Sequence, residues 1–261
     1  MKRRRVDTLL AERGLSPSRT SAAASIRAGS VRVGRGGARA SKPGQLVAVD
    51  EALALEEPPR YVSRGGIKLE NALRELDVEV AGRDCLDVGA STGGFTDCLL
   101  RHGAARVCAL DVAHGQLDWG IRNDERVHVI ERANARHLDP AELPWPPSLA
   151  TIDVSFISLR KVMPAVAEAI APDGELLALV KPQFELGRER VGRGGVVRDP
   201  GARRDALAAV AHAAAELGLA VHGFVPSGLP GPKGNVETFV WCWRGGDGIA
   251  DLDAAIAEVD A

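Results

Sequence analysis

The stretch LDVGASTGGF, residues 86–95, decides the fold. An apolar run ends at Val88, and three glycines and two small hydroxyl residues follow it, directly before a second apolar segment. This pattern is typical of a β-strand that turns tightly into a helix around a phosphate or a nucleoside. Such turns occur in open α/β sheets, so the stretch predicts an α/β domain with a ligand at the turn.

From residue 84 onward, segments of strand and helix character alternate. Strands are expected at 85–89, 106–112, 127–131, 149–155, 175–181, 219–225 and 236–243, and helices at 94–102, 158–170 and 199–217. This alternation predicts a doubly wound sheet of seven mostly parallel strands. The segment PSGLPGPKGN, 226–235, is too short for a crossover helix, so the last strand is expected to run antiparallel to its neighbour.

The residues of the turn distinguish among three ligands. A phosphate-binding loop needs a lysine where Phe95 stands, and a dinucleotide loop needs a glycine where Ser91 stands. S-adenosylmethionine (SAM) carries no phosphate and tolerates a side chain there, so SAM is favoured and a nicotinamide dinucleotide is the alternative. Asp111 ends the next strand and is expected to accept the ribose hydroxyls of either cofactor. The expected cofactor contacts are Gly89, Ser91, Thr92, Gly93, Gly94, Phe95, Asp111 and Val112, with Asn134 at the adenine.

The charge of the chain is uneven. Residues 1–50 contain eleven Lys and Arg against three Asp and Glu, whereas the remainder contains 22 against 32. This basic head predicts a module that binds a polyanion. Two short helices are expected in it, one ending at Gly14 and one capped by Ser16 or Ser18 and ending at Gly29, followed by strands near 31–33 and 46–49.

The pattern RVD..L...G...SR..A...I..G.V.V......KPG in this head resembles the αL RNA-binding fold of a small-subunit ribosomal protein and of pseudouridine synthases. The resemblance implies a small α+β RNA-binding domain over residues 1–57, in which Arg3, Arg5, Arg19 and Lys42 contact RNA phosphates. The proline pair in EEPPRYVSRGG, 56–66, predicts a linker at 58–65, followed by the large domain at 66–261.

Cysteines, histidines and apolar runs exclude several classes of protein. Cys85, Cys98, Cys108 and Cys242 lack disulfide or metal-ligand spacing, and so do the six histidines. The basic first residues precede no apolar signal segment, and no run approaches the roughly 20 apolar residues of a membrane span. A cytoplasmic protein with reduced thiols is expected, with no bound metal, membrane contact or obligate protein partner.

Four charged residues interrupt apolar segments. Lys68 is expected to begin a helix, Asp153 and Lys181 to close the fourth and fifth strands, and Glu237 to open the last one. Ligands bind outside the carboxyl ends of parallel strands, and an antiparallel last strand starts at that same edge. The four are therefore expected to converge beside the turn, where paired acids and lysines perturb each other's pKa. A buried structural ion pair is the alternative for Asp153 and Lys181.

Together with GASTGGFTD, VKPQFE and PGPKGNVE, these residues closely resemble the TlyA family of ribosomal RNA 2′-O-methyltransferases, also labelled hemolysin A, and more widely the FtsJ-type RNA ribose methyltransferases. The resemblance covers essentially the whole chain. It implies a Rossmann-like SAM-dependent methyltransferase domain that modifies cytidines in the RNA of both ribosomal subunits. It also places the family's catalytic tetrad on Lys68, Asp153, Lys181 and Glu237. Arg64 is expected to contact RNA, and so are Arg132 and Arg136, which flank Asn134 at the active-site edge; exposed loop residues without a role are the alternative for these two.

The chemistry of the four side chains matches that reaction. A ribose 2′-OH must lose its proton while it attacks the methyl group, and a free lysine, with a pKa of about 10.4, is a poor base. Burial and a neighbouring cation lower a lysine's pKa. Lys181 is therefore expected to deprotonate or steer the hydroxyl and Lys68 to stabilise the alkoxide. The alternatives are a non-catalytic ribosomal RNA-binding or assembly factor, an NAD-linked oxidoreductase and a membrane-lytic hemolysin.

Overall fold

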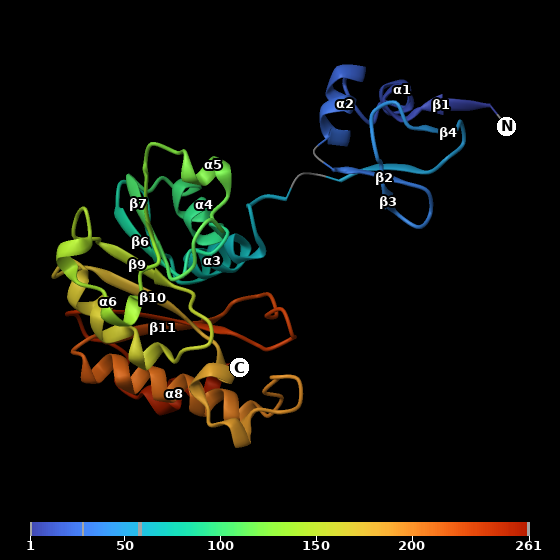
Figure 1. Cartoon of the computed structure of the whole chain (residues 1–261). Coiled ribbons are helices and arrows are strands. Elements are labelled where there is room, and N and C mark those ends of the chain that lie inside the picture. Colours follow the sequence, from blue (N-terminus) through green and yellow to red (C-terminus); the bar gives the residue numbers. More distant parts are fainter. Residues whose placement is uncertain (1, 28, 57–58, 260–261) are drawn as a thin grey trace. The chain divides into compact units, whose positions relative to one another are not determined.

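The chain divides into two compact units, Met1–Pro59 and Arg60–Ala261 (Figure 1). The structure, a computed structural model, describes residues 2–27, 29–56 and 59–259. Residue 57, where the predicted head ends, and residue 58, where the predicted linker begins, lie outside the described residues. The head unit is built around one buried apolar cluster and the large unit around two.

The head unit contains both predicted helices and more strands than predicted. Helix α1 spans Val6–Glu12 and is followed by Gly14 at φ +71°, and α2 spans Arg19–Arg27, with Ser18 Oγ accepting the Ser21 N–H. Ala28, inside the predicted second helix, lies outside the described residues. The strands are β1 (Arg3–Arg5), β2 (Val31–Val33), β3 (Ala38–Arg39), β4 (Leu46–Ala48) and β5 (Leu53–Leu55).

Strands β1, β3 and β5 had not been predicted. The arginine run of β1 pairs antiparallel with β4, and β2 pairs with both β3 and β5. None of the three is an alternating apolar segment of ordinary strand length. β1 and β5 become strands by pairing with distant partners, and β3 by pairing with the nearby β2. The core beneath them is built from Val6, Leu9, Leu10, Ala22, Ile26, Val31, Ala40 and Val47.

The large unit contains one seven-stranded sheet, in the order β11-β12-β10-β9-β6-β7-β8. All seven predicted strands are present, as β6 (Asp84–Val88), β7 (Arg106–Asp111), β8 (Val127–Glu131), β9 (Leu149–Ile152), β10 (Glu175–Val180), β11 (Ala220–Pro226) and β12 (Thr238–Trp243). β12 lies between β10 and β11 and is antiparallel to both, whereas the pairs among β6 to β10 are parallel. The mostly parallel sheet and its antiparallel last strand are confirmed.

Helices cover both faces of this sheet (Figure 1). On one face pack α3 (Arg64–Glu75), α4 (Gly94–Arg101) and α5 (Trp119–Arg122). On the other pack α6 (Met163–Ala169), α8 (Pro200–Glu216) and α9 (Leu252–Glu258). The short α7 (Pro182–Glu185) follows β10, and single 3₁₀ turns lie at Ala135–His137, Pro140–Glu142, Leu159–Lys161 and Arg188–Arg190. Apolar side chains packed on both faces hold the strands of the sheet, and therefore the ends of these strands, in place.

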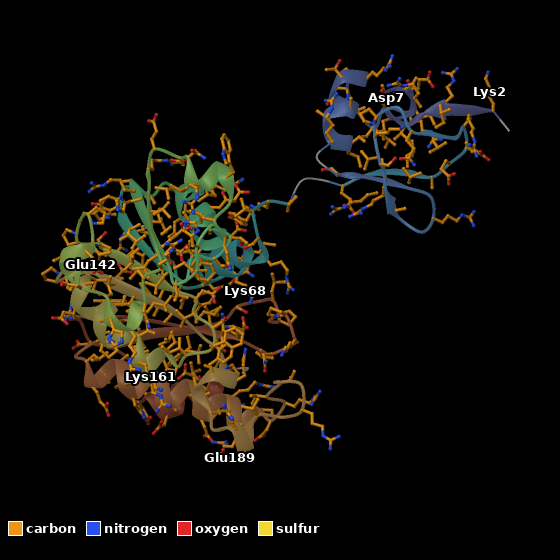
Figure 2. All side chains as sticks on the ribbon, in the orientation of Figure 1. Lys2, Asp7, Lys68, Glu142, Lys161 and Glu189 are labelled. Atoms are coloured by element: carbon orange, nitrogen blue, oxygen red, sulfur yellow. The ribbon has the colours of Figure 1, made fainter. Side chains whose placement is uncertain are left out.

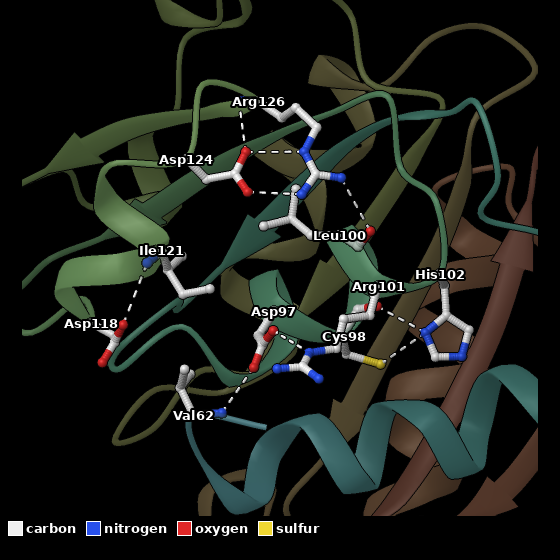
Figure 3. Close-up of polar contacts among 10 residues, drawn as sticks. All are labelled: Val62, Asp97, Cys98, Leu100, Arg101, His102, Asp118, Ile121, Asp124 and Arg126. Carbon is white, nitrogen blue, oxygen red and sulfur yellow. Dashed lines mark hydrogen bonds and ion pairs between the residues drawn. The ribbon is translucent and has the colours of Figure 1, made fainter. Parts of the chain in front are cut away.

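The predicted linker is wrong from Tyr61 onward. Tyr61 is buried, and its ring lies so close to Gly66 that a Cβ on Gly66 would be 2.3 Å from Tyr61 Cγ. The Val62 N–H donates to Asp97 on α4, which also accepts from Arg101 (Figure 3). Ser63 caps α3, which begins at Arg64. Proline and glycine in this segment suggested a spacer, but the tyrosine between them anchors it to the core.

In the part of the chain that the structure describes, helices are too short or too polar to cross a membrane. All four cysteines are buried and free.

Candidate active site

The edge of the sheet where the parallel strands end carries three of the four predicted charged residues. Asp153 and Lys181 directly follow β9 and β10, which are adjacent and parallel. Glu237 directly precedes β12, whose first residue pairs with the last residue of β10. The sequence predicted that these three residues lie within the strands, at their ends; in the structure each lies one residue outside its strand. The sheet register therefore brings all three to one edge.

Lys68 reaches this edge from α3, on which it is the fifth residue rather than the first (Figure 2). Its Nζ forms an ion pair with Glu237, and both side chains are buried. A second pair lies beside it: Lys181 Nζ is 2.5 Å from Asp153 Oδ1 and donates to Ser155 Oγ at 3.0 Å. The first pair is buried and the second half-buried. Charges removed from water in this way require partners, and each lysine has a carboxylate.

All four side chains line a single pocket of about 640 Å³ together with the glycine turn. Of the predicted cofactor contacts, this pocket includes Gly89, Ser91, Thr92, Gly94 and Phe95. The turn has left-handed backbone at Gly89 (φ +87°), Ser91 (φ +50°) and Gly93 (φ +94°). A volume of this size suits a nucleoside-containing cofactor and the reacting part of a substrate.

Gly89 holds the turn against the end of β9. A Cβ added there would lie 2.5 Å from the Asp153 carbonyl oxygen, and the φ of +87° disfavours any side chain. We expect Gly89→Ala to lower the free energy of unfolding by about 2 kcal/mol or more and to weaken cofactor binding at least about tenfold, because the turn or Asp153 must move.

Gly82→Ala is a matched control for this change. Gly82 has φ +73°, and a Cβ there would meet nothing within 4 Å. Because of backbone strain, the control should also lower the free energy of unfolding measured by urea denaturation. Its affinity for SAM, measured by calorimetry, should stay unchanged. Equal loss of affinity in both variants would show that the turn's contact with Asp153 is unimportant.

The remaining predicted cofactor residues lie elsewhere. Asp111 lines a small adjoining depression that shares Ala90 and Ser91 with the main pocket. Its carboxylate accepts the N–H groups of Ser91 and Ala113, both at 2.7 Å, and each oxygen keeps lone-pair capacity for a ribose hydroxyl. A Cβ on Gly93 would point at Leu117, and the side chain of Val112 is 69% exposed. Asn134 lines neither of these two pockets. Its amide oxygen accepts the Arg136 N–H and caps a 3₁₀ turn.

Asp87, which was not among the predicted site residues, has a buried carboxyl group beneath the turn. It lies in the middle of the sheet, and its Oδ2 accepts from Thr96 Oγ1 at 2.6 Å. Burial raises the pKa of Asp87 from 3.8 to about 7, against the opposing hydrogen bond from Thr96. An acid inside the apolar run of β6 was the signal that sequence inspection could have used.

This pKa makes stability depend on pH. The folded protein keeps the Asp87 proton between about pH 4 and 7, whereas the unfolded chain releases it, so the stabilisation is complete below pH 4 and is lost as the pH rises through 7. Comparing pH 5 with pH 8, we expect a loss of about 2 kcal/mol in the free energy of unfolding that is missing in Asp87→Asn. Identical pH profiles for the two proteins in urea denaturation would contradict the assignment.

The predicted RNA-contacting residues are all exposed. Arg64 begins α3, lines the main pocket and donates to the Pro230 carbonyl at 2.7 Å. Arg132 follows β8 at φ +59°, and Arg136 lines a shallow pocket that also includes Phe156, whose side chain is 92% exposed. Arg64 therefore places positive charge at the main pocket and Arg136 at the shallow pocket, which shares Phe156 with the main one.

In the head unit, Arg3, Arg5, Arg19 and Lys42 are exposed. Arg5 and Arg19 both bond the buried Asp7, labelled in Figure 2, at 2.6 Å and 3.3 Å. These bonds, chiefly the one from Arg5, lower the pKa of Asp7 to about 2. Asp7 therefore holds two of the predicted phosphate-binding guanidinium groups in fixed positions.

Comparison with known proteins agrees with this geometry. A model of the FtsJ-like methyltransferase family matches residues 61–244, which include the whole pocket. The chain belongs to this family. The match begins at Tyr61, the residue at which the structure shows the large unit's packing to begin.

Several relatives match almost the whole chain. The 16S/23S rRNA (cytidine-2′-O)-methyltransferase TlyA of Mycobacterium tuberculosis is 50% identical over 92% of this chain and 90% of its own. Hemolysin A of Brachyspira hyodysenteriae is 38% identical over 89% of this chain and 97% of its own. A solved "putative hemolysin" from Streptococcus thermophilus is 39% identical, with a TM-score of 0.73, and the match covers 99% of this chain and 96% of that one. Proteins with methyltransferase names and proteins with hemolysin names are thus both similar to this chain.

Proposed function

We propose that this FtsJ-like methyltransferase transfers a methyl group from SAM to the ribose 2′-oxygen of cytidines in ribosomal RNA of the 16S and 23S classes. The observation that carries the proposal is the convergence of two lysine–carboxylate pairs on the pocket that contains the glycine turn. The substrate is taken from the relative in M. tuberculosis, whose name specifies these RNAs and this atom.

The turn suits SAM as the methyl donor. Phe95, 3% exposed, occupies the position at which a phosphate-binding loop has its lysine, so the turn lacks that charge for a phosphate. SAM supplies a methyl group on a positively charged sulfur. The turn from Gly89 to Phe95 would hold its amino acid part, and Asp111 its ribose.

The protein's own groups then act on the hydroxyl. The attacking 2′-oxygen forms a bond to the methyl carbon as the carbon–sulfur bond breaks, and the hydroxyl proton must leave. Asp153 and Ser155 hold two positions on the Lys181 nitrogen. As an ammonium, Lys181 would hold the oxygen in line with its third N–H, and as a neutral amine it would take the hydroxyl proton on its lone pair. Lys68, held by Glu237, stabilises the negative charge that develops. Alignment of the reacting atoms contributes much of the rate.

The head unit would bind the RNA. Its αL-type assignment rests on the sequence pattern, and its exposed arginines and Lys42 supply the charge that phosphates require. On the large unit, Arg64, Arg132 and Arg136 would bind RNA phosphates. A substrate in the ribosome would place the protein in the cytoplasm.

Incubation with labelled SAM and unmodified ribosomal subunits tests the proposal. We expect methyl incorporation into the RNA of both subunits. Binding of ribosomal RNA without incorporation would overturn the enzyme assignment in favour of an assembly factor. Quenching of tryptophan fluorescence by NADH but not by SAM would favour the oxidoreductase. Leakage of liposomes caused by the purified protein would favour the hemolysin.

A further inference from the structure

Two loops outside the four-residue cluster also line the pocket. The 187–198 loop follows α7 and contributes Val191 and Gly195. The 227–235 loop joins β11 to β12, and Pro230, Gly231, Pro232, Lys233 and Asn235 line the pocket from it. Most of the 187–198 loop is exposed, and it contains four glycines and four arginines, so little apolar packing holds it in place.

Asn235 joins these two loops. Its side chain is buried, with Asn235 only 2% exposed. Nδ2 donates to the Gly195 carbonyl at 2.8 Å, and Oδ1 accepts the N–H of the buried Val197 at 2.9 Å. Both ends of one amide thus pair with the backbone of the 187–198 loop. Loss of this amide leaves two backbone groups without a partner, which is costly in a buried setting.

The 227–235 loop in turn contacts the catalytic cluster. The Gly231 N–H donates to the Asn235 carbonyl at 2.9 Å, which closes a tight turn. A Cβ on Gly231 would lie only 2.3 Å from Glu237 Oε1, so the turn packs directly on the carboxylate that holds Lys68. The other end of the loop is anchored to α3 by Asn71, whose Nδ2 donates to the Ser227 carbonyl at 3.1 Å.

From these contacts we infer that Asn235 is a positioning residue that fastens the 187–198 loop against the pocket and couples that fastening to the Lys68–Glu237 pair. The fastening does not depend on the reaction, whereas its effect on turnover rests on the proposed function. A closed loop excludes water from the site and completes the geometry around the lysines.

Two substitutions remove the fastening to different degrees. Asn235→Asp keeps the size of the side chain and the acceptor for Val197 but replaces the donor to Gly195 with a second acceptor. Asn235→Ala removes both bonds. Asn71→Ala is the matched control, because it removes an amide bond to the 227–235 loop that does not reach the 187–198 loop.

Hydrogen exchange measured by mass spectrometry on the full chain tests the fastening. We expect peptides within 187–198 to exchange at least about tenfold faster in both Asn235 variants, and at the wild-type rate in Asn71→Ala. Unchanged exchange in Asn235→Asp and Asn235→Ala would overturn the inference. Faster exchange throughout the large unit would also overturn it, since that result indicates general destabilisation.

Kinetics on ribosomal subunits test the coupling. With RNA saturating, kcat should fall at least about tenfold in Asn235→Asp, while the Kd for SAM stays within about twofold and Asn71→Ala keeps the wild-type kcat. Wild-type kcat in the Asn235 variants would contradict the coupling. Failure of the wild-type protein to methylate RNA would instead contradict the proposed function, and the exchange result would still decide the fastening.

Discussion

Lys181→Ala is expected to lower kcat for methyl transfer about 10³-fold or more while SAM still binds with nearly unchanged affinity. Lys181 is the pocket lysine whose nitrogen is held by both Asp153 and Ser155, at the end of the strand next to β9. Removing it takes away the group that accepts the proton or fixes the oxygen, and such groups contribute about 10² to 10⁴ in rate. Single-turnover methylation and calorimetry with SAM measure the two effects separately.

A second substitution distinguishes the two roles of this lysine. Lys181→Arg keeps the positive charge, but a guanidinium does not give up its proton near neutral pH. If Lys181 accepts the proton, Lys181→Arg should be as inactive as Lys181→Ala; if it steers the oxygen, partial activity should remain. Turnover near the wild-type rate in Lys181→Ala would contradict both roles.

The second large effect is expected at the buried pair of Lys68 and Glu237. Lys68→Met or Glu237→Met alone should lower the free energy of unfolding by about 3 kcal/mol, because each leaves a buried charge without its partner. The double variant, which leaves neither charge, should recover most of that loss and still be inactive. Urea denaturation followed by tryptophan fluorescence reports this unit, since all four tryptophans lie in it.

The double variant also tests why the pair is there. Recovery of stability without activity would show that the pair is kept for catalysis. Additive losses in the double variant would show instead that the two residues do not act as a pair, in disagreement with the structure.

The sheet and the converging charges were predictable from the sequence because local patterns determine them. Apolar runs bounded by glycine identify the strands, and the rule that ligands bind at the carboxyl ends of parallel strands brings Asp153 and Lys181 together. The short segment before β12 implies an antiparallel last strand, which places Glu237 at the same edge. The pairing of each lysine with its own carboxylate was not visible, because it depends on side-chain directions.

Features that depend on contacts between distant segments were missed or misplaced. β1 is an arginine run that becomes a strand only by pairing with β4. Tyr61 lies in a segment with the composition of a linker, yet it packs on Gly66. The bonds from Asn235 to the 187–198 loop and the use of Asn134 as a cap are equally invisible in the order of residues.

The most direct test of the central claim follows the labelled methyl group to its chemical position. Ribosomal subunits that lack the modification are incubated with the protein and labelled SAM, and the RNA is then hydrolysed with alkali. A methyl group on the 2′-oxygen blocks cleavage of the adjacent linkage, so the label should appear in alkali-resistant dinucleotides that begin with cytidine, and Lys181→Ala should yield none. Label recovered only in single nucleotides would place the methyl group on a base and contradict the claim.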